Sequence, residues 1–203
     1  MTARRCLLTL LKVVLAVPVA LIVAGCADDA APLDESAPED TGASEQSLLL
    51  STRPGEKPDV TVGIPHVQLD QTSSDELLAQ LSMRSFALEG VVEQPSRASG
   101  PGARALTVAP ALPTRGEAMI VEREFAHIHP RPNGAGSLHL VLPPDHAAMV
   151  VDQGWGEYHP FALDGSIPNL VMVYAPRDDE DLDVVMTIVE ASAAYAMGTD
   201  EAG

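Results

Sequence analysis

Apolar positions recur every three or four residues in three segments of the chain, which is the spacing of one face of a helix. Leu77, Leu78 and Leu81 form the first stripe, directly after two serines that can cap a helix. The second stripe covers residues 143–153, and the third covers residues 178–197. Acidic residues at the start of the third segment favour the amino end of a helix. We therefore predict three helices.

Other apolar segments are short, rich in β-branched residues and bounded by Gly and Pro, as strands are. The predicted strands are residues 105–108, 119–129, 137–142 and 170–174, and residues 60–69 are expected to be extended. The Asn133-Gly134-Ala135-Gly136 sequence suits a hairpin between the second and third strands. Residues 93–97 and 154–158 are expected to be loops. The fold class predicted is α+β, a single small domain of mainly antiparallel sheet with helices packed on one face.

The amino end has a different pattern, in the order of a lipoprotein signal. Two arginines precede a mostly apolar segment over residues 7–23, and Val23-Ala24-Gly25 directly precedes Cys26. The run is short for a spanning helix of about 20 residues. We therefore expect residues 1–25 to be a cleaved signal of bacterial type and Cys26 to carry the lipid. The protein would then be anchored at the cell envelope, outside the cytoplasm.

The chain has 29 acidic and 12 basic residues, and a first group of acidic residues follows Cys26. Residues 26–50 hold seven acidic residues, no basic one and many Ala, Ser and Pro, which predicts a disordered tether. Residues 51–199 are then the folded domain. The formal net charge of −17 would repel nucleic acid, so no nucleic-acid partner is expected. Because Cys6 lies in the signal, the mature chain has no disulfide and no thiolate metal site.

Candidate chemistry lies in the histidines, five of which fall between positions 127 and 159. His127 and His129 are two apart on a predicted strand, so their side chains leave the same face. His139 lies on the paired strand, and His159 follows a turn-rich loop that can fold back over the patch. Such imidazoles can ligate a metal, act as general bases or hydrogen-bond within the fold. These three possibilities remain open from the residues alone.

Five ordered blocks of sequence resemble the luciferase-domain family, whose best-known members are the fungal luciferases. The blocks are Arg123-Glu124-Phe125-Ala126-His127-Ile128-His129, Leu138-His139-Leu140, Gly154-Trp155-Gly156 with His159-Pro160, Tyr174-Ala175-Pro176-Arg177, and Ile188-Val189-Glu190-Ala191-Ser192 with Tyr195. In that family a hydroxylated styryl-pyrone is oxidised by molecular oxygen, with no metal or organic cofactor known to be required. The resemblance is strongest over residues 119–197.

The resemblance implies roles for particular residues. His127, His129, His139 and His159 would bind and deprotonate the substrate, with Glu124 orienting one imidazole and Arg123 or Arg177 stabilising the anion. Trp155 and Tyr174 would line the substrate pocket together with Arg177. For Trp155, an anchor that pins its loop to the core is the alternative, and for Arg177 a salt bridge at the following helix. Molecular oxygen would be the co-substrate, and no cofactor is expected.

Three functions therefore remain in competition. The first is an enzyme that uses oxygen or acid-base chemistry on a flat phenolic or pyrone-like molecule. The second is an envelope protein that binds a small molecule or a metal without turnover. The third is a metal-dependent oxygenase of cupin type, which the His127-x-His129 spacing suggests, although no Glu follows at the usual distance. Elemental analysis of the purified domain for bound metal, followed by oxygen uptake with candidate enols, distinguishes the three functions.

Overall fold

The computed structural model describes residues 48–200, which form six strands and four α-helices. The strands are β1 (Val91–Pro95), β2 (Arg104–Val108), β3 (Glu124–Ile128), β4 (Leu138–Val141), β5 (Gly156–Tyr158) and β6 (Leu170–Val173). The helices are α1 (Asp75–Phe86), α2 (Pro144–Asp152), α3 (Pro160–Leu163) and α4 (Asp179–Met197), with a 3-10 turn, η1, at Gly116–Ala118. The α+β class is confirmed.

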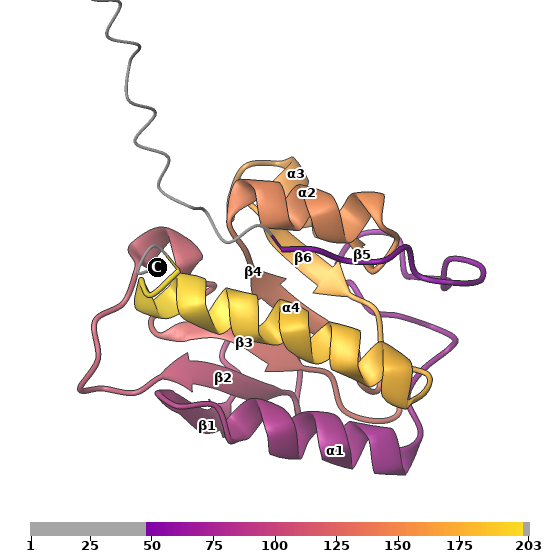
Figure 1. Cartoon of the computed structure of the whole chain (residues 1–203), viewed down its shortest axis with the longest axis horizontal. Coiled ribbons are helices and arrows are strands. Elements are labelled where there is room, and N and C mark those ends of the chain that lie inside the picture. The colour runs from indigo at the N-terminus through magenta and orange to yellow at the C-terminus, as the bar shows by residue number, and fades with distance from the viewer. Residues whose placement is uncertain (1–47, 201–203) are drawn as a thin grey trace, which may run out of the picture. The chain divides into compact units, whose positions relative to one another are not determined.

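All six strands belong to one antiparallel sheet, in the order β1-β2-β3-β4-β6-β5. The β3–β4 hairpin lies at its centre, where the expected glycine turn joins the two strands (Figure 1). Both central strands are buried along their whole length. Residues on both faces of the hairpin are therefore covered.

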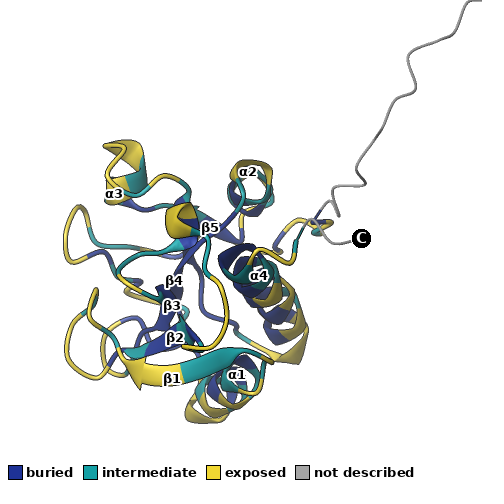
Figure 2. Ribbon diagram, turned by 90° about the vertical axis from the view of Figure 1, so that its left-hand side faces the viewer, coloured by how far each residue is buried: buried dark blue, intermediate teal, exposed yellow. Residues whose placement is uncertain are grey.

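Helices α1, α2 and α4 lie together on one side of the sheet, while α3 and the long loops lie on the other (Figure 2). The helical side holds the apolar core, to which Ala126 and Ile128 of β3 and Leu138 and Leu140 of β4 contribute. Since side chains alternate along a strand, the residues between them point to the opposite side. That opposite side, covered by loops, carries the histidines.

Local sequence sets the helix ends as expected. The Ser74 hydroxyl accepts a hydrogen bond from the Leu77 amide at the start of α1, and the Asp178 carboxylate accepts one from the Asp181 amide at the start of α4. Helix α4 ends at Gly198 in the left-handed conformation, φ 67°. These caps fix the two longest helices of the described chain.

Three elements differ from the sequence prediction. Residues 91–95 form the edge strand β1, although residues 93–97 were expected to be a loop, because Pro95 tolerates an edge position. The expected loop at residues 154–158 contains strand β5, which pairs with the strongly apolar β6. The strand expected over residues 119–129 begins only at Glu124, because Glu122 adopts φ 51° in a tight turn.

The folded region reaches back further than residue 51. Leu48 is only 6% exposed and belongs to the apolar core, and its amide donates to Nε2 of His146. The folded domain therefore includes Leu48, which the sequence prediction assigned to the tether. The expected signal, Cys26 and the remainder of the expected tether lie outside the described residues. Among residues 48–200, no helix has the length and apolar character needed to cross a membrane.

Candidate functional site

Strands β3 and β4 bring three predicted histidines together on the loop-covered side. His127 and His139 are direct cross-strand partners, and Nε2 of His127 lies 3.1 Å from Nδ1 of His139. The His129 ring centroid is 4.5 Å from that of His139. All three residues are at most 6% exposed. The period of two and the hairpin thus place the three imidazoles in one buried cluster.

Glu124 joins this cluster because of an irregularity in β3. Pairing with β2 shifts between Leu106↔Ala126 and Thr107↔Glu124, which leaves Phe125 as an extra residue. In a regular strand, residues 124 and 127 would point to opposite faces. The shift turns Glu124 to the histidine side, where its Oε1 accepts a hydrogen bond from Nδ1 of His127 at 2.8 Å.

The Glu124 carboxylate is held by two further donors. The Ser96 hydroxyl donates to Oε1 at 2.7 Å, and the Arg97 amide donates to Oε2 at 2.9 Å. Burial by itself would raise the pKa of Glu124, but the hydrogen bonds from His127, Arg97 and Ser96 outweigh it and lower the pKa. Glu124 is therefore an ionised buried carboxylate that orients the His127 ring.

His159 approaches from the end of β5, as expected, and a fifth histidine that the sequence did not single out completes the cluster. The His159 ring contacts the His139 ring edge-on, with centroids 4.5 Å apart. His66 stacks on His139 at 5.6 Å and contacts His159 edge-on at 5.0 Å. His66 lies 61 residues before His127 in a segment without regular structure. No spacing rule could have linked it to the hairpin.

The segment that carries His66 is fastened to the sheet by Gln68. The Gln68 side chain accepts a hydrogen bond from the Ala175 amide at 2.9 Å and donates to the carbonyls of Asp70 and Gln71. Gln68 is 1% exposed, so these bonds are shielded from water. A bridge between Val60 and Gln68 closes the segment into a loop. The loop thereby places His66 against the other histidines on this side of the sheet.

His66 has its own carboxylate partner. Nε2 of His66 lies 2.8 Å from Oε1 of Glu157, while Lys57 and the Tyr174 hydroxyl bond to Oε2 of the same carboxylate at 2.7 and 2.9 Å. Burial opposes ionisation of Glu157, but the bonds from Lys57, His66 and Tyr174 prevail and lower its pKa. Tyr174 thus reaches the site through Glu157, not as the pocket wall expected.

A cavity of about 580 Å³ opens beside the cluster. Four histidines line it: His66, His129, His139 and His159. Much of the remaining wall is apolar and comes from the loops, including Ile64, Pro65, Leu69, Pro101, Pro130 and Phe161. Apolar walls with a few polar groups on one side are typical of small-molecule sites. His127 is not among the lining residues and lies behind His139.

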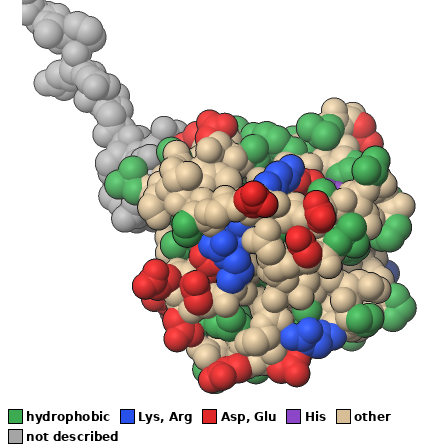
Figure 3. Space-filling view, turned by 90° about the vertical axis from the view of Figure 1, so that its right-hand side faces the viewer, with side chains coloured by type: hydrophobic (Ala, Val, Ile, Leu, Met, Phe, Trp, Pro, Cys, Tyr) green, Lys and Arg blue, Asp and Glu red, His purple; other side chains and the backbone are tan. Residues whose placement is uncertain are grey.

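The five histidines of the cluster are buried, each at most 6% exposed, and three of the imidazoles resist protonation. On the one face shown in Figure 3, only a trace of histidine surface is visible. Burial, assisted by the neighbouring rings, lowers the pKa of His129 to about 3 and that of His159 to about 4. The pKa of His139 is also lowered, chiefly by burial. These three rings are therefore neutral at pH 7, as metal ligands and proton acceptors must be.

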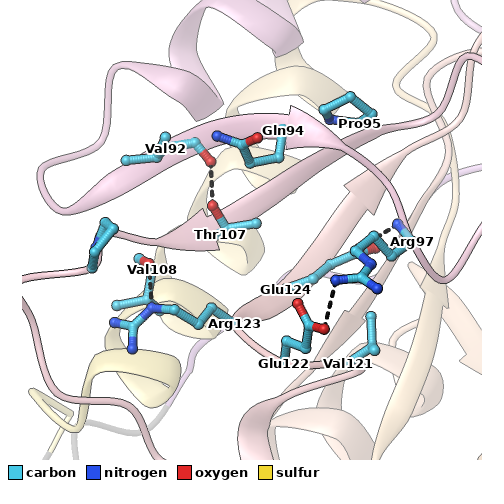
Figure 4. Close-up of a pocket in the computed structure, with 11 residues that line it drawn as sticks. Val92, Gln94, Pro95, Arg97, Thr107, Val108, Val121, Glu122, Arg123 and Glu124 are labelled. Atoms are coloured by element: carbon cyan, nitrogen blue, oxygen red, sulfur yellow. Dashed lines mark hydrogen bonds and ion pairs between the residues drawn. The ribbon is translucent and has the colours of Figure 1, made fainter.

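Arg123, expected to stabilise an anion at the histidines, does not line this cavity. Its guanidinium donates to the carbonyls of Val108, Ala109 and Leu112. It lines a second cavity, of about 480 Å³, between β1, β2 and the turn before β3 (Figure 4). Figure 4 shows the guanidinium turned to the Val108 carbonyl. Arg123 thus stabilises the loop that follows β2 through hydrogen bonds to its backbone carbonyls.

Arg177 and Trp155 also have structural partners. Arg177 pairs with the buried Asp181 carboxylate at 2.6 Å and donates to the Pro54 carbonyl at 2.8 Å. Trp155 is 2% exposed and donates from Nε1 to the Ser51 carbonyl at 2.6 Å. Neither residue lines the histidine cavity. The salt-bridge and anchor alternatives therefore describe these two residues.

Part of the chain is similar in sequence to known proteins. Residues 122–192, from the turn before β3 into α4, match the family model described as "Luciferase domain". The luciferase of Armillaria gallica is 38% identical over 95 residues, and that of Neonothopanus nambi is 37% identical over 95 residues. The match covers 45% of this chain in both cases, and 35% and 34% of the two relatives.

The chain therefore spans about a third of the length of the curated relatives that it matches. No solved structure matches it. The matched region contains Glu124, His127, His129, His139, Glu157 and His159, whereas His66 lies outside it. The resemblance to the luciferase-domain family is therefore confirmed over residues 122–192 of this chain.

Proposed function

We propose that this protein oxidises a flat, enolisable phenolic or pyrone-like molecule with molecular oxygen in the histidine cavity. The observation that carries the proposal is His66, which lines a largely apolar cavity and pairs with the half-buried Glu157 carboxylate outside the cavity lining. Such walls suit an aromatic ring, and the polar side suits its hydroxyl group. The relatives are named luciferases, which supports oxidation as the class of reaction.

His66 is the proposed general base. Its Nε2 faces the Glu157 carboxylate, so in the neutral ring the proton stays on Nε2 and Nδ1 keeps its lone pair. Nδ1 is buried and has no hydrogen-bond partner within residues 48–200. A substrate hydroxyl that reaches this nitrogen would find an acceptor oriented by a fixed carboxylate. His66 then takes the enol proton.

His159 is the proposed donor to the resulting anion. The Phe161 amide donates to Nδ1 of His159 at 3.1 Å, so the proton of the neutral ring lies on Nε2. A neutral N–H beside an apolar wall stabilises developing negative charge. The enolate carbon then adds O₂ and the proton returns to the terminal peroxide oxygen. One O₂ is consumed per substrate, and no other reductant is needed.

Oxygen uptake by the full chain with simple 4-hydroxy-2-pyrones and catechols tests the proposal. Wild-type protein should consume oxygen, and His66→Gln should lower the rate by about 10²–10⁴-fold. Glu157→Gln should lower the rate less, since Gln still accepts from His66. Glu190→Gln, the same change at an exposed site on α4 across the sheet, is the control and should be neutral. Uptake that His66→Gln leaves unchanged would exclude His66 as the base.

Binding without turnover is the competing outcome. Equilibrium dialysis with the same pyrones measures binding independently of oxygen consumption. If the pyrones bind and no oxygen is consumed, the protein is a small-molecule carrier and the oxidation proposal fails. If none binds, the substrate class is wrong.

We also propose that the domain is held at the cell envelope by a lipid on Cys26. The support is the order of the amino-terminal segments, with a small-residue pair directly before Cys26. Labelling cells with a radioactive fatty acid tests it. Cys26→Ser should abolish incorporation, because only a thiol forms the thioether to diacylglycerol. Incorporation at the wild-type level in the variant would contradict the anchor.

A further inference from the structure

The three histidines of the β3–β4 hairpin have the arrangement of a metal site. One ring nitrogen each of His127, His129 and His139 lies within 4.8 Å of the other two. All three residues are buried, and they come from the two central strands of the sheet. Each of these buried rings must satisfy its polar nitrogens through hydrogen bonds or through a ligand.

The hydrogen bonds around two of these rings direct a lone pair into the group. Nδ1 of His127 faces the Glu124 carboxylate, which accepts only, so the proton lies on Nδ1 and Nε2 keeps its lone pair. Nδ1 of His129 faces the Ser137 hydroxyl at 2.9 Å, and that hydroxyl donates its own proton to the Gly134 carbonyl at 2.7 Å. The Ser137 hydroxyl must therefore accept a hydrogen bond from Nδ1 of His129. The ring proton of His129 lies on Nδ1, and Nε2 keeps its lone pair, as in His127.

Metal-binding histidines are held in just this way, with the second ring nitrogen donating to a carboxylate or another acceptor. The spacing of the rings agrees. Nε2 of His127 and Nδ1 of His139 lie 3.1 Å apart, close to the about 3.3 Å that separates two nitrogens bound tetrahedrally to zinc at 2.0–2.1 Å. In the metal-free chain Nδ1 of His139 donates to Nε2 of His127. Because Nε2 of His139 has no hydrogen-bond partner in the described chain, this ring can move its proton to Nε2 and free Nδ1 for the metal without opposing another donor.

A second trio, His66, His139 and His159, is equally compact but has the wrong proton arrangement. The Phe161 amide donates to Nδ1 of His159, which places the ring proton on Nε2, the nitrogen that would have to bind. The hydrogen bonds thus favour the hairpin trio over this one.

We propose that His127, His129 and His139 bind one divalent first-row transition metal ion, whose remaining coordination positions face the cavity. His129 and His139 line that cavity, and His127 closes the site from behind. Three imidazoles and no thiolate suit zinc, copper or iron, and three protein ligands with an open position are typical of catalytic sites. Glu124 and Ser137 are positioning residues for the site. This inference does not depend on the proposed oxidation.

Zinc and cobalt binding by the metal-free full chain, without an affinity tag, tests the proposal. Competition against a chromogenic chelator should give one Zn²⁺ per chain. The visible absorption of the Co²⁺ form should have the intensity of a four- or five-coordinate ion. His127→Gln and His129→Gln should each remove tight binding. Ser137→Ala and Glu124→Ala should weaken it about 10–100-fold, the usual effect of losing such a partner, and Glu124→Gln should recover most of the loss.

His159→Gln is the discriminating control, because it alters the second trio and leaves the hairpin trio intact. This variant should bind one Zn²⁺ with unchanged affinity. Loss of binding in His159→Gln, or two Zn²⁺ per wild-type chain, would overturn the assignment. A folded wild-type protein that binds no Zn²⁺ or Co²⁺ would overturn the site itself. Circular dichroism of each variant shows whether a lost signal reflects unfolding.

Discussion

Gly156 lies where β5 pairs with β6, and a larger residue does not fit there. A Cβ at this position would overlap the backbone carbonyl of Met172, which is the neighbour of its cross-strand partner Val173. Strand β6 is paired on both sides, so its backbone atoms cannot move aside without breaking the sheet. Gly156 thus determines how closely β5, and with it Glu157, approaches the cluster.

Gly156→Ala should therefore destabilise the protein by about 2 kcal/mol or more, within or above the usual cost of overpacking. Gly116→Ala is the matched control, because a Cβ there meets nothing within 4 Å and the backbone conformation is ordinary. The control should change the free energy of unfolding by less than about 0.5 kcal/mol. Urea denaturation of both variants measures this, and equal stabilities would refute the packing argument.

Trp155 gives a second prediction at the scale of one side chain. Trp155→Phe removes the hydrogen bond from Nε1 to the Ser51 carbonyl and should lower stability by about 1–2 kcal/mol. Oxygen uptake and zinc affinity should stay unchanged, because Trp155 does not line the histidine cavity. A selective loss of activity in a stable variant would restore Trp155 as a substrate-binding residue.

Helix α4 depends at its amino end on a buried ion pair. Asp181 is 3% exposed and accepts hydrogen bonds from the Arg177 guanidinium and the Arg177 amide. Burial would raise the pKa of Asp181, but these bonds overcome it and hold the pKa below its usual value. A carboxylate with a lowered pKa stabilises the folded state only while it is ionised.

The pH dependence of stability tests this pair. The contribution of Asp181 should be complete above the unfolded pKa of about 3.9 and should disappear as the pH falls through the lower folded value. Asp181→Asn should thus be less stable than wild type at pH 7, with a gap that narrows in acid. Urea denaturation of both proteins at a series of pH values measures the difference in their free energies of unfolding. If the difference in free energy of unfolding were the same at all pH values, the charge of Asp181 would not contribute to stability.

At the scale of the whole molecule, the segment before Arg53 is part of the fold. Leu48 belongs to the core, the Ser51 carbonyl accepts from Trp155, and the Arg53 amide donates to the Gln153 carbonyl at 2.8 Å. Together these contacts attach the start of the domain to helix α2 and strand β5. The boundary expected at residue 51 cuts through this attachment.

Two truncations of the mature chain test the boundary. Removing residues 27–45 should change the melting temperature by no more than a few degrees, since that stretch lacks the apolar content to join a core. Removing residues 27–50 should cost about 2 kcal/mol more, because burial of a leucine side chain is worth about that much. Thermal melts of the two proteins measure the difference, and equal melting temperatures would show that Leu48 contributes nothing.

Local pattern was sufficient for much of the fold and part of the site. The helical stripes, the capping serine of α1 and the glycine turn at residues 133–136 act over a few residues, so α1, α2, α4 and the central hairpin could be predicted. The same period of two placed His127 and His129 on one face, with His139 opposite. Strands β1 and β5 were missed because they form only through pairing with apolar neighbours.

The sequence by itself determined the α+β class, the acidic character and the hairpin that gathers three imidazoles, because each depends on periodicity or on turn chemistry between near neighbours. Only the tertiary structure decided that His66 joins them, since Gln68 fastens a distant loop over the sheet. It also decided that Glu124 faces His127, through one extra residue in β3, and that Arg123, Arg177 and Trp155 bind backbone or a neighbouring carboxylate. Such contacts depend on which distant atoms meet, and no local spacing encodes them.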